Sequence, residues 1–390
     1  MNFVWRWIWL VLGCGPVCFS GMAAHAAEKT MLVYIGTYTG AKSKGIYVSR
    51  FDADSGKLSA PELAAETKSP TFLALHPDGR VLYAANEIHN FNGKRSGAVS
   101  AFAIDEKTGK LNLLNEQPSG GDGPCHLAVD GTGKYVLVAN YGSGSVAALP
   151  IEADGRLAEP SVTIRNEGSS VDPHRQSGPH AHFITTDPGN RFALSCDLGL
   201  DKVLVYRLNA GKTAGSPALV ANDPPSISVK PGSGPRHLAF HPNGRYVYLI
   251  NEMGWTLTAF SYDARRGALE EIQTVSTVPE KFAGENLSAE VQVHPSGKFV
   301  YASNRGHDSI AVFAIDSESG RLSYVEHQST GGRTPRHFAI DPSGHWLLAE
   351  NQESDSIVIF RIDSKTGRLS AMGQAVEAGS PVCAVFVPVK

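Results

Sequence analysis

One pattern recurs six times along this chain and limits the folds that it can adopt. Each copy has an apolar strand, a turn that combines Gly with Pro, Asp, Asn or Ser, and a second apolar strand that ends near Asn or Asp. These end residues are equivalent from copy to copy and lie 47 to 57 residues apart. They are Asn86, Asn140, Asp197, Asn251, Asn304 and Asn351. A period of this length indicates a repeat architecture.

A second pair of strands follows each copy. In GAVSAFAIDEKTGKL, DSIAVFAIDSESGRL and DSIVIFRIDSKTGRL, a strand ends in Asp, and a turn before Leu opens another strand. Four strands within about 50 residues are typical of one blade of a β-propeller. No helical periodicity competes in these windows.

The two ends of the chain supply one further blade. MLVYIGTYT, from Met31, and GIYVSRFDADSGKL, from Gly45, provide its later strands, and SPVCAVFVPVK, from Ser380, provides its first strand. Pairing the ends closes the ring. The sequence therefore predicts an all-β, seven-bladed propeller with four-stranded antiparallel blades. The polar, Pro/Gly-rich stretch from Asn209 to Lys230 is expected to be a long connection.

Composition and the N-terminus limit where the protein works. The 390 residues include 35 basic and 38 acidic ones, so no basic surface for nucleic acid is expected. Arg6 precedes an apolar run from Trp7 to Phe19, and Ala24-His25-Ala26 follows. This layout is typical of a secretory signal and is short for a membrane span. We expect residues 1–26 to be removed and 27–390 to form one periplasmic or secreted domain. A lipid anchor at Cys14 is the alternative.

Three cysteines follow the signal segment. Cys125, Cys196 and Cys383 are widely spaced and lie in apolar, strand-like segments. The sequence therefore predicts buried free thiols without a metal-binding pattern.

Residues shared by many blades are expected to be structural, because each blade solves the same packing problem. Three histidines precede the strand-connecting turn and are expected to support it: His76, His241 and His294. Three others recur near the start of the first strand, where they either line the channel or form hydrogen bonds between blades: His126, His237 and His337.

Departures from the repeat indicate the functional site. The first strand of each blade lines the channel, and its start lies at the same face as the end of the second strand. The starts carry Thr71, Cys125, His182, Arg236, Ala289 and Arg336, and the ends are followed by Glu87, Tyr141, Leu198, Glu252, Arg305 and Gln352. His180 and His182 are two apart and are expected to face the same side of a strand. Glu290 takes the place that the recurring histidines hold elsewhere. Convergence of these side chains predicts a binding site, a solvated charged rim being the alternative.

Several segments resemble the lactonase family of seven-bladed propellers. They are YIGTYT, GPHAHF, GPRHLAFHPNGRYVYLINE, YASNRGHDSIAVF and TPRHFAIDPSG, and the resemblance extends from Met31 to Lys390. The family includes a bacterial 6-phosphogluconolactonase and the fungal carboxy-muconate lactonizing enzyme. The resemblance implies a hydrolase of the 6-phosphogluconolactonase type with catalytic residues at His180 or His182, Arg236, Glu252 and Arg305. It implies no cofactor or metal. Where relatives usually have Asp-Ile-His, this chain has Glu290-Val291-Gln292.

Lactone hydrolysis gives these residues defined roles. A histidine would activate water, and an arginine would stabilise the oxyanion or hold a substrate anion. Glu252 would orient a neighbour or protonate the leaving alkoxide. Four further residues are expected to bind the substrate: Glu290, His126, His237 and Arg336. No serine nucleophile is needed.

The function that the sequence favours is a monomeric exported enzyme that opens a small sugar-type lactone. Two alternatives remain open, and the first is a non-catalytic exported propeller that binds a small ligand or a protein. Export argues for an unphosphorylated lactone. A metal-dependent lactonase would use His180 and His182 with Glu290 or Glu252.

Overall fold

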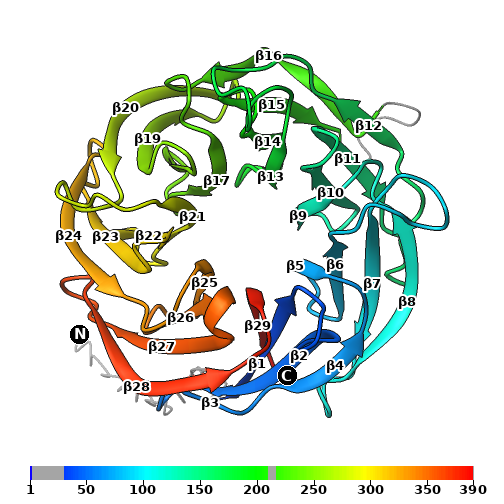
Figure 1. The fold of residues 1–390 in the computed structure, drawn as a ribbon, viewed down its shortest axis with the longest axis horizontal. Coiled ribbons are helices and arrows are strands. Elements are labelled where there is room, and N and C mark those ends of the chain that lie inside the picture. The colour runs from blue at the N-terminus through cyan, green and yellow to red at the C-terminus, as the bar shows by residue number, and fades with distance from the viewer. Residues whose placement is uncertain (2–29, 210–216, 390) are drawn as a thin grey trace.

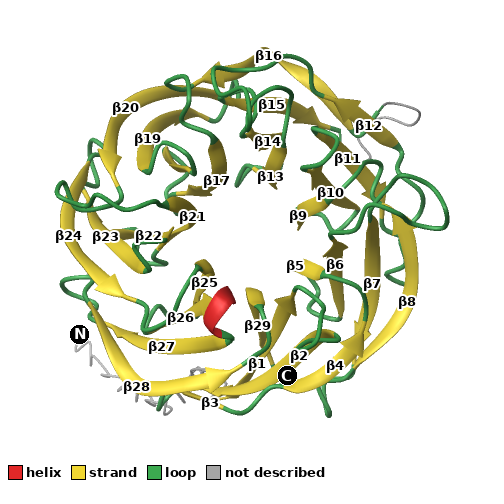
Figure 2. Cartoon of the chain, viewed as in Figure 1, coloured by secondary structure: helices red, strands yellow, loops and turns green. Residues whose placement is uncertain are grey.

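Seven antiparallel sheets are arranged as a ring around a central axis (Figure 1). The computed structural model describes Met1 and residues 30–209 and 217–389, so the predicted signal segment beyond Met1 and the anchor alternative at Cys14 lie outside the described residues. Figure 2 shows a ring built from strands, to which the described chain adds one short helix, η1 (Gln352–Ser354). No helix within the described ranges is long and apolar enough to cross a membrane.

Six sheets consist of four strands in chain order, with the first strand innermost (Figure 1). They are β5 (Pro70–Leu75), β6 (Val81–Asn86), β7 (Ala98–Ile104) and β8 (Leu111–Pro118); β9 (Pro124–Val129), β10 (Tyr135–Asn140), β11 (Ser145–Pro150) and β12 (Val162–Arg165); β13 (Ala181–Thr186), β14 (Phe192–Asp197), β15 (Lys202–Leu208) and β16 (Leu219–Ser228); β17 (Pro235–Phe240), β18 (Tyr246–Asn251), β19 (Thr256–Asp263) and β20 (Ala268–Ser276); β21 (Leu287–Val293), β22 (Phe299–Arg305), β23 (Ser309–Ile315) and β24 (Leu322–Ser329); β25 (Pro335–Ile340), β26 (Trp346–Asn351), β27 (Ser356–Ile362) and β28 (Leu369–Glu377).

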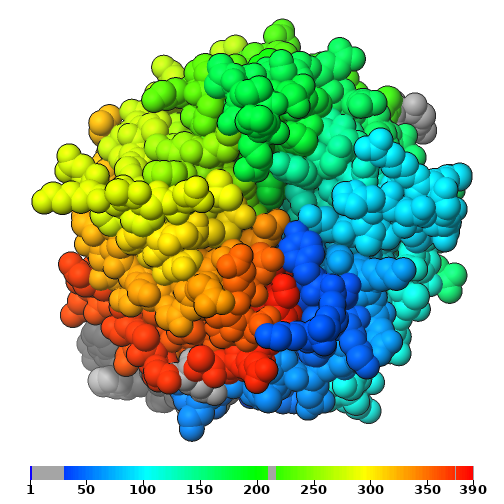
Figure 3. Space-filling model, in the orientation of Figure 1, coloured from blue at the N-terminus to red at the C-terminus, as the bar shows by residue number. Residues whose placement is uncertain are grey.

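The seventh sheet joins the two ends of the chain, as predicted. The C-terminal strand β29 (Pro381–Pro388) pairs with β1 (Thr30–Thr37), which pairs with β2 (Gly45–Asp52). Two short segments, β3 (Lys57–Leu58) and β4 (Glu62–Glu66), both pair with β2 on its outer side. In Figure 3 the red C-terminal residues lie between the orange blade and the blue N-terminal residues. This pairing leaves no gap in the ring.

Packing between neighbouring blades explains why the second strands are apolar throughout. Strands such as β6, β18 and β26 are buried along their whole length, because both faces contact an adjacent sheet. Buried tyrosines also connect blades: the hydroxyl of Tyr83 donates to the Gly155 carbonyl at 3.0 Å, and that of Tyr248 to the Gly320 carbonyl at 3.1 Å. A buried hydroxyl with such a partner avoids the cost of an unsatisfied polar group.

The turn histidines are structural, as predicted. Each reaches the following blade, where its Nε2 donates to a turn carbonyl: His76 to Gly133 at 3.2 Å, His241 to Gly297 at 2.8 Å and His294 to Gly344 at 2.7 Å. Cys125, Cys196 and Cys383 are buried and free, which confirms that prediction as well.

The predicted connection between Asn209 and Lys230 is partly wrong, because residues 219–228 form β16. This is the outer strand of its blade, and its pairing with β15 shifts between Leu204 and Tyr206. Pro224 and Pro225 lie in the stretch of β16 opposite this shift, where β16 donates no backbone hydrogen bonds to β15. An edge strand therefore accommodates residues that typically mark a loop.

Candidate active site

A β-bulge at the start of each inner strand positions the site residues. In the β17–β18 pair, Pro235 lies opposite Asn251 and His237 opposite Ile250, which leaves Arg236 between them without a partner residue. The same shift occurs in the other repeats at Thr71, Cys125, His182, Ala289 with Glu290, and Arg336. A bulge changes the direction of a side chain. The residue type thus varies most between blades at the bulge position, where the backbone departs from regular strand geometry.

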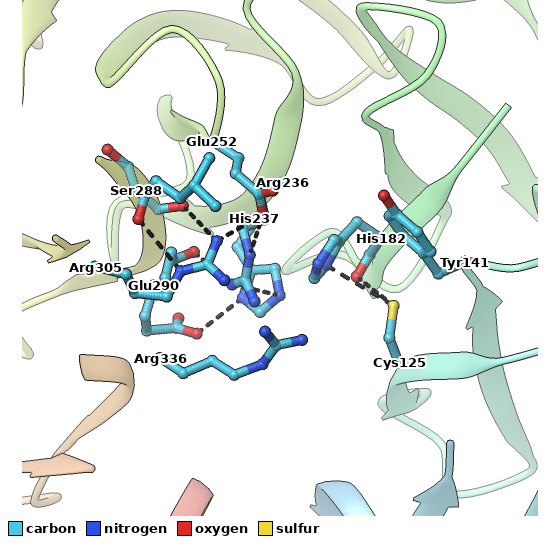
Figure 4. A network of polar contacts seen from close by, with 12 residues as sticks. Cys125, Tyr141, His182, Arg236, His237, Glu252, Ser288, Glu290, Arg305 and Arg336 are labelled. Carbon is cyan, nitrogen blue, oxygen red and sulfur yellow. Dashed lines mark hydrogen bonds and ion pairs between the residues drawn. The ribbon is translucent and has the colours of Figure 1, made fainter. Parts of the chain in front are cut away.

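Glu252 is held by three guanidinium groups, of which Figure 4 shows those of Arg236 and Arg305. Its Oε1 lies 2.7 Å from Arg175 Nη2, and its Oε2 lies 3.0 Å from Arg236 Nε and 2.8 Å from Arg305 Nη2. The Glu252 and Arg236 side chains are almost fully buried. Arg236 also donates to the carbonyl oxygen of Ala289 at 2.7 Å. These contacts fix the carboxylate and the surrounding arginines in one arrangement.

The arginines keep Glu252 ionised. Burial alone would raise the pKa of this carboxyl, but Arg305 and Arg236 hold it well below its usual value. Burial lowers the pKa of Arg305 to about 9 despite the opposing effect of Glu252, so this guanidinium is still charged at neutral pH. A carboxylate in this state orients cations and does not donate a proton.

Arg336 differs from the other three arginines at this mouth. Its guanidinium lies 5.5 Å from the centre of the Tyr38 ring, and Nη2 donates to the Tyr38 hydroxyl at 3.1 Å. That hydroxyl donates to Glu87 Oε2 at 2.7 Å. Burial opposes the charge of Arg336, yet Tyr38 and Glu87 raise its pKa overall. Within the described residues no carboxylate lies in ion-pair distance of Arg336, so its charge is available to a ligand.

The two candidate histidines have different surroundings. His180 precedes β13, its ring stacks on Tyr141 at 4.4 Å, and its Nδ1 donates to the Tyr141 carbonyl at 3.0 Å. His182 is the bulge residue, is buried, and has Nδ1 at 3.8 Å from Cys125 Sγ. The expectation that both histidines lie in one regular strand is wrong, because His180 precedes β13 and His182 lies at the bulge, where side chains no longer alternate. Both rings nevertheless contact Tyr141.

Burial keeps His182 neutral. Desolvation lowers its pKa well below the ordinary value, and the nearby charge of Arg236 acts in the same direction.

Three of the residues expected to bind substrate form a closed layer under the mouth. His126 contacts Phe72 and Phe183, with ring centres 4.0 Å and 4.1 Å away, and His237 Nδ1 lies 2.8 Å from Glu290 Oε2. His126, His237 and Glu290 are buried, and none of them lines the hollows described below. The repeat predicted that these residues lie close to the propeller axis, but it did not predict how far below the mouth they lie. His337 continues this layer, with Nδ1 at 2.8 Å from Glu350.

Two connected hollows open above this layer. The inner one, about 240 Å³, is lined by Glu87, Cys125, Tyr141, Arg175, His182, Glu252, Leu287, Arg305 and Arg336. The outer one, about 690 Å³, shares Arg175, Leu287, Arg305 and Arg336 with it. Three arginines and two glutamates line the inner hollow, so it presents a small excess of positive charge to a ligand. Volumes of this order are typical of small-molecule sites.

Arg175 was not predicted from the sequence. It lies in the segment between β12 and β13, outside the repeat, and its Nη2 contacts both Glu252 and the Tyr141 hydroxyl, the latter at 3.3 Å. The sequence offered one signal that could have identified Arg175: it is a basic residue in the connection between blades that leads into the GPHAH segment.

The metal-site alternative needed His180 and His182 beside Glu252 or Glu290. In the described part of the chain no three His, Cys, Asp or Glu side chains form a group with metal-binding geometry. Glu252 instead contacts arginines, and Glu290 contacts His237.

The fold and the charged hollow define a seven-bladed propeller with a small-molecule site at one mouth. The family described as lactonase, 7-bladed beta-propeller, matches residues 32–386. The chain is 40% identical to a 6-phosphogluconolactonase of Bacillus subtilis over 78% of this chain and 83% of that protein, and 35% identical to one of Formosa agariphila over 79% and 85%. The periplasmic gluconolactonase of Pseudomonas aeruginosa superposes with a TM-score of 0.87 at 36% identity, covering 93% of this chain and all of that one. This chain belongs to the lactonase family and is a lactone-hydrolysing enzyme of the 6-phosphogluconolactonase type.

Proposed function

We propose that this protein is an exported, monomeric enzyme that hydrolyses a sugar-type lactone in the inner hollow. The carrying observation is the pairing of a neutral histidine, His182, with a guanidinium without a carboxylate partner, Arg336, in one cavity. The N-terminal signal pattern and the likeness to a periplasmic gluconolactonase support export and an unphosphorylated substrate. A closed ring needs no partner to cover an edge, which supports a monomer.

In the proposed reaction, water attacks the lactone carbonyl carbon while His182 accepts one of its protons. The carbonyl oxygen becomes an oxyanion facing Arg336 and Arg305. The bond between the carbonyl carbon and the ring oxygen then breaks, and protonated His182 returns its proton to the leaving alkoxide. A low pKa suits this second step, because the imidazolium loses its proton readily beside Arg236.

Two buried groups are assigned supporting roles. Ionised Glu252 orients Arg305 and Arg175, which removes it as a proton donor to the alkoxide. Arg236 is a positioning residue, since it lies behind Glu252 and lines neither hollow.

The first test is a proton-release assay with residues 27–390. Ring opening yields a hydroxy acid that ionises at neutral pH, so turnover is read as acid production after spontaneous hydrolysis is subtracted. Glucono-δ-lactone is expected to be turned over well above background, and 6-phosphoglucono-δ-lactone less efficiently. No enzymatic rate with either lactone would contradict the proposal.

The choice between the histidines gives a second prediction. His182→Gln is expected to reduce kcat/KM by about 10²–10⁴-fold, as for loss of a general base, whereas the matched variant His180→Gln retains most activity. In the wild type, kcat/KM is expected to stay constant down through pH 6.5 and to fall only at lower pH, because the base has a lowered pKa. Equal losses in the two variants, or an acid limb centred above pH 6.5, would assign the base elsewhere.

A further inference from the structure

The outer hollow is larger than the proposed chemistry needs. It extends from the shared arginines over Met253, Trp255 and the segment from Glu285 to Leu287. The inner hollow of about 240 Å³ already holds the groups assigned to the reaction. The additional volume of about 690 Å³ therefore leaves space for a part of the substrate that does not react.

Trp255 is anomalous within the repeat. Four residues after the recurring Asn or Asp of the second strand, the chain turns through a left-handed conformation in several blades, with φ of 51° to 59° at Gly144, Asp201, Asp308 and Asp355. Gly and Asp tolerate this region, whereas a bulky side chain is uncommon there. Trp255 occupies the equivalent position with φ of 52°.

The aspartates at this position connect one blade to the next. Asp201 Oδ1 accepts the Gly234 amide at 2.7 Å, Asp308 Oδ1 the Thr334 amide at 2.8 Å, and Asp355 Oδ1 the Ser380 amide at 2.8 Å. Trp255 keeps the backbone part of this arrangement, since its carbonyl accepts the Thr277 amide at 2.9 Å, but its indole cannot accept the side-chain bond. The hydrogen bond that joins neighbouring blades at this position therefore does not explain the tryptophan.

The surroundings of Trp255 indicate the chemistry of an occupant. The half-buried indole contacts Phe282 edge-on, with ring centres 6.3 Å apart, and lines the outer hollow. The same hollow presents polar acceptors from Asp172, Glu285, Gln352 and Glu353. An aromatic ring beside carboxylate and amide groups suits a sugar, whose C–H face packs on the ring and whose hydroxyls donate to the acceptors. The three carboxylates of the outer hollow balance the three arginines that it shares with the inner hollow, so it has no excess positive charge for an anionic extension. The number of charged groups disfavours a long acyl chain.

We infer that the outer hollow is a second sugar subsite, and that the substrate class is an aldonolactone carrying a further neutral glycosyl unit. This inference rests on the proposed function, because the lactone ring must lie in the inner hollow. Trp255 is then a specificity-determining residue that contacts the glycosyl unit.

The test compares glucono-δ-lactone with maltobiono-δ-lactone on the wild type, Trp255→Phe and Trp255→Asp. The Asp variant restores the residue of the repeat, so its thermal stability is expected to equal or exceed that of the wild type. It is expected to raise KM for the disaccharide lactone about tenfold and to change kcat/KM for the monosaccharide lactone less than about twofold. The Phe variant keeps an aromatic face and is expected to stay close to the wild type.

Fluorescence gives a readout that does not need turnover. Residues 27–390 contain two tryptophans, Trp255 and Trp346, and Trp346 is buried with its indole N–H donating to the Ala53 carbonyl at 2.8 Å. Rapid mixing with maltobiono-δ-lactone, but not with glucono-δ-lactone, is expected to change the emission, and Trp255→Phe is expected to abolish the change.

The outcomes separate the subsite from the reaction. An emission change without turnover would retain the subsite and overturn the proposed function. Turnover of both lactones with equal effects of Trp255→Asp on the two, or with none on the disaccharide lactone, would overturn the subsite alone. Absence of both signals would overturn both.

Discussion

Replacing Glu252 by Gln is expected to lower the free energy of unfolding by about 3–5 kcal/mol at pH 7, the usual cost of breaking a buried ion pair from one side. The substitution preserves shape and leaves Arg236 and Arg305 buried without a counter-charge. Activity is expected to fall as well, because the amide keeps only one of the two oxygen acceptors that orient the three arginines and turns an NH2 donor toward a guanidinium. Urea unfolding followed by near-UV circular dichroism measures the stability change.

The difference between Glu252→Gln and the wild type is expected to depend on pH. The folded-state pKa of Glu252 is lowered, so its contribution is present above the unfolded value of about 4.3 and is lost as the pH falls below it. The two proteins should therefore differ most at neutral pH and converge in acid. The control is Glu66→Gln, an exposed residue 3.9 Å from Lys44, which is expected to change stability by less than about 0.5 kcal/mol. A loss equal to that of the control would show that Glu252 is not a structural counter-ion.

The fold was predictable because every blade repeats the same local solution. The residue at the end of each second strand illustrates this: Asn86 Nδ2 donates to the Lys68 carbonyl at 2.7 Å, and Asn304 Nδ2 donates to the Thr277 carbonyl at 2.6 Å. Each bond fixes the end of a strand to the loop before the inner strand. Because several blades need this bond, the same residue type recurs at a nearly constant spacing, and such a recurrence can be detected in a single sequence.

The site was predictable only in part, because a repeat aligns positions without giving the direction or depth of side chains. Arg236 and Arg305 depart from the pattern and do converge on Glu252. The bulge at His182 and the irregular backbone at His180 could not be derived from alternation. Arg175 lies in the connection between β12 and β13, which is longer than the corresponding connections of the other blades, so a comparison between repeats gives Arg175 no equivalent position.

The departure from the family pattern at Gln292 has a physical explanation. Its Nε2 donates to the Phe338 carbonyl at 2.7 Å, and its Oε1 accepts the Ile340 amide at 3.1 Å. The amide thus bonds to both kinds of backbone group of β25 in the next blade. A side chain that serves as donor and acceptor at once meets this requirement, so Gln292 acts in blade packing and lies outside both hollows.

Arg336→Met is expected to reduce kcat/KM by about 10²–10³-fold, the usual effect of removing one oxyanion donor. Methionine keeps an unbranched apolar stem but removes the charge and all donors. Stability is expected to change little, because Arg336 contacts Tyr38 and has no ion pair with a described carboxylate. Kinetics with glucono-δ-lactone, together with thermal unfolding, separate the two effects.

The form of the loss in Arg336→Met distinguishes two roles of the guanidinium. A fall in kcat at constant KM indicates a contact made in the transition state, as proposed, whereas a rise in KM at constant kcat indicates uniform binding of the substrate. Arg333→Met is the matched control, since Arg333 lies three residues earlier, is exposed and lines neither hollow. Because Arg175, Arg236 and Arg305 already share Glu252, the charge that stabilises the oxyanion must come mainly from Arg336, and unchanged kinetics in Arg336→Met would refute that assignment.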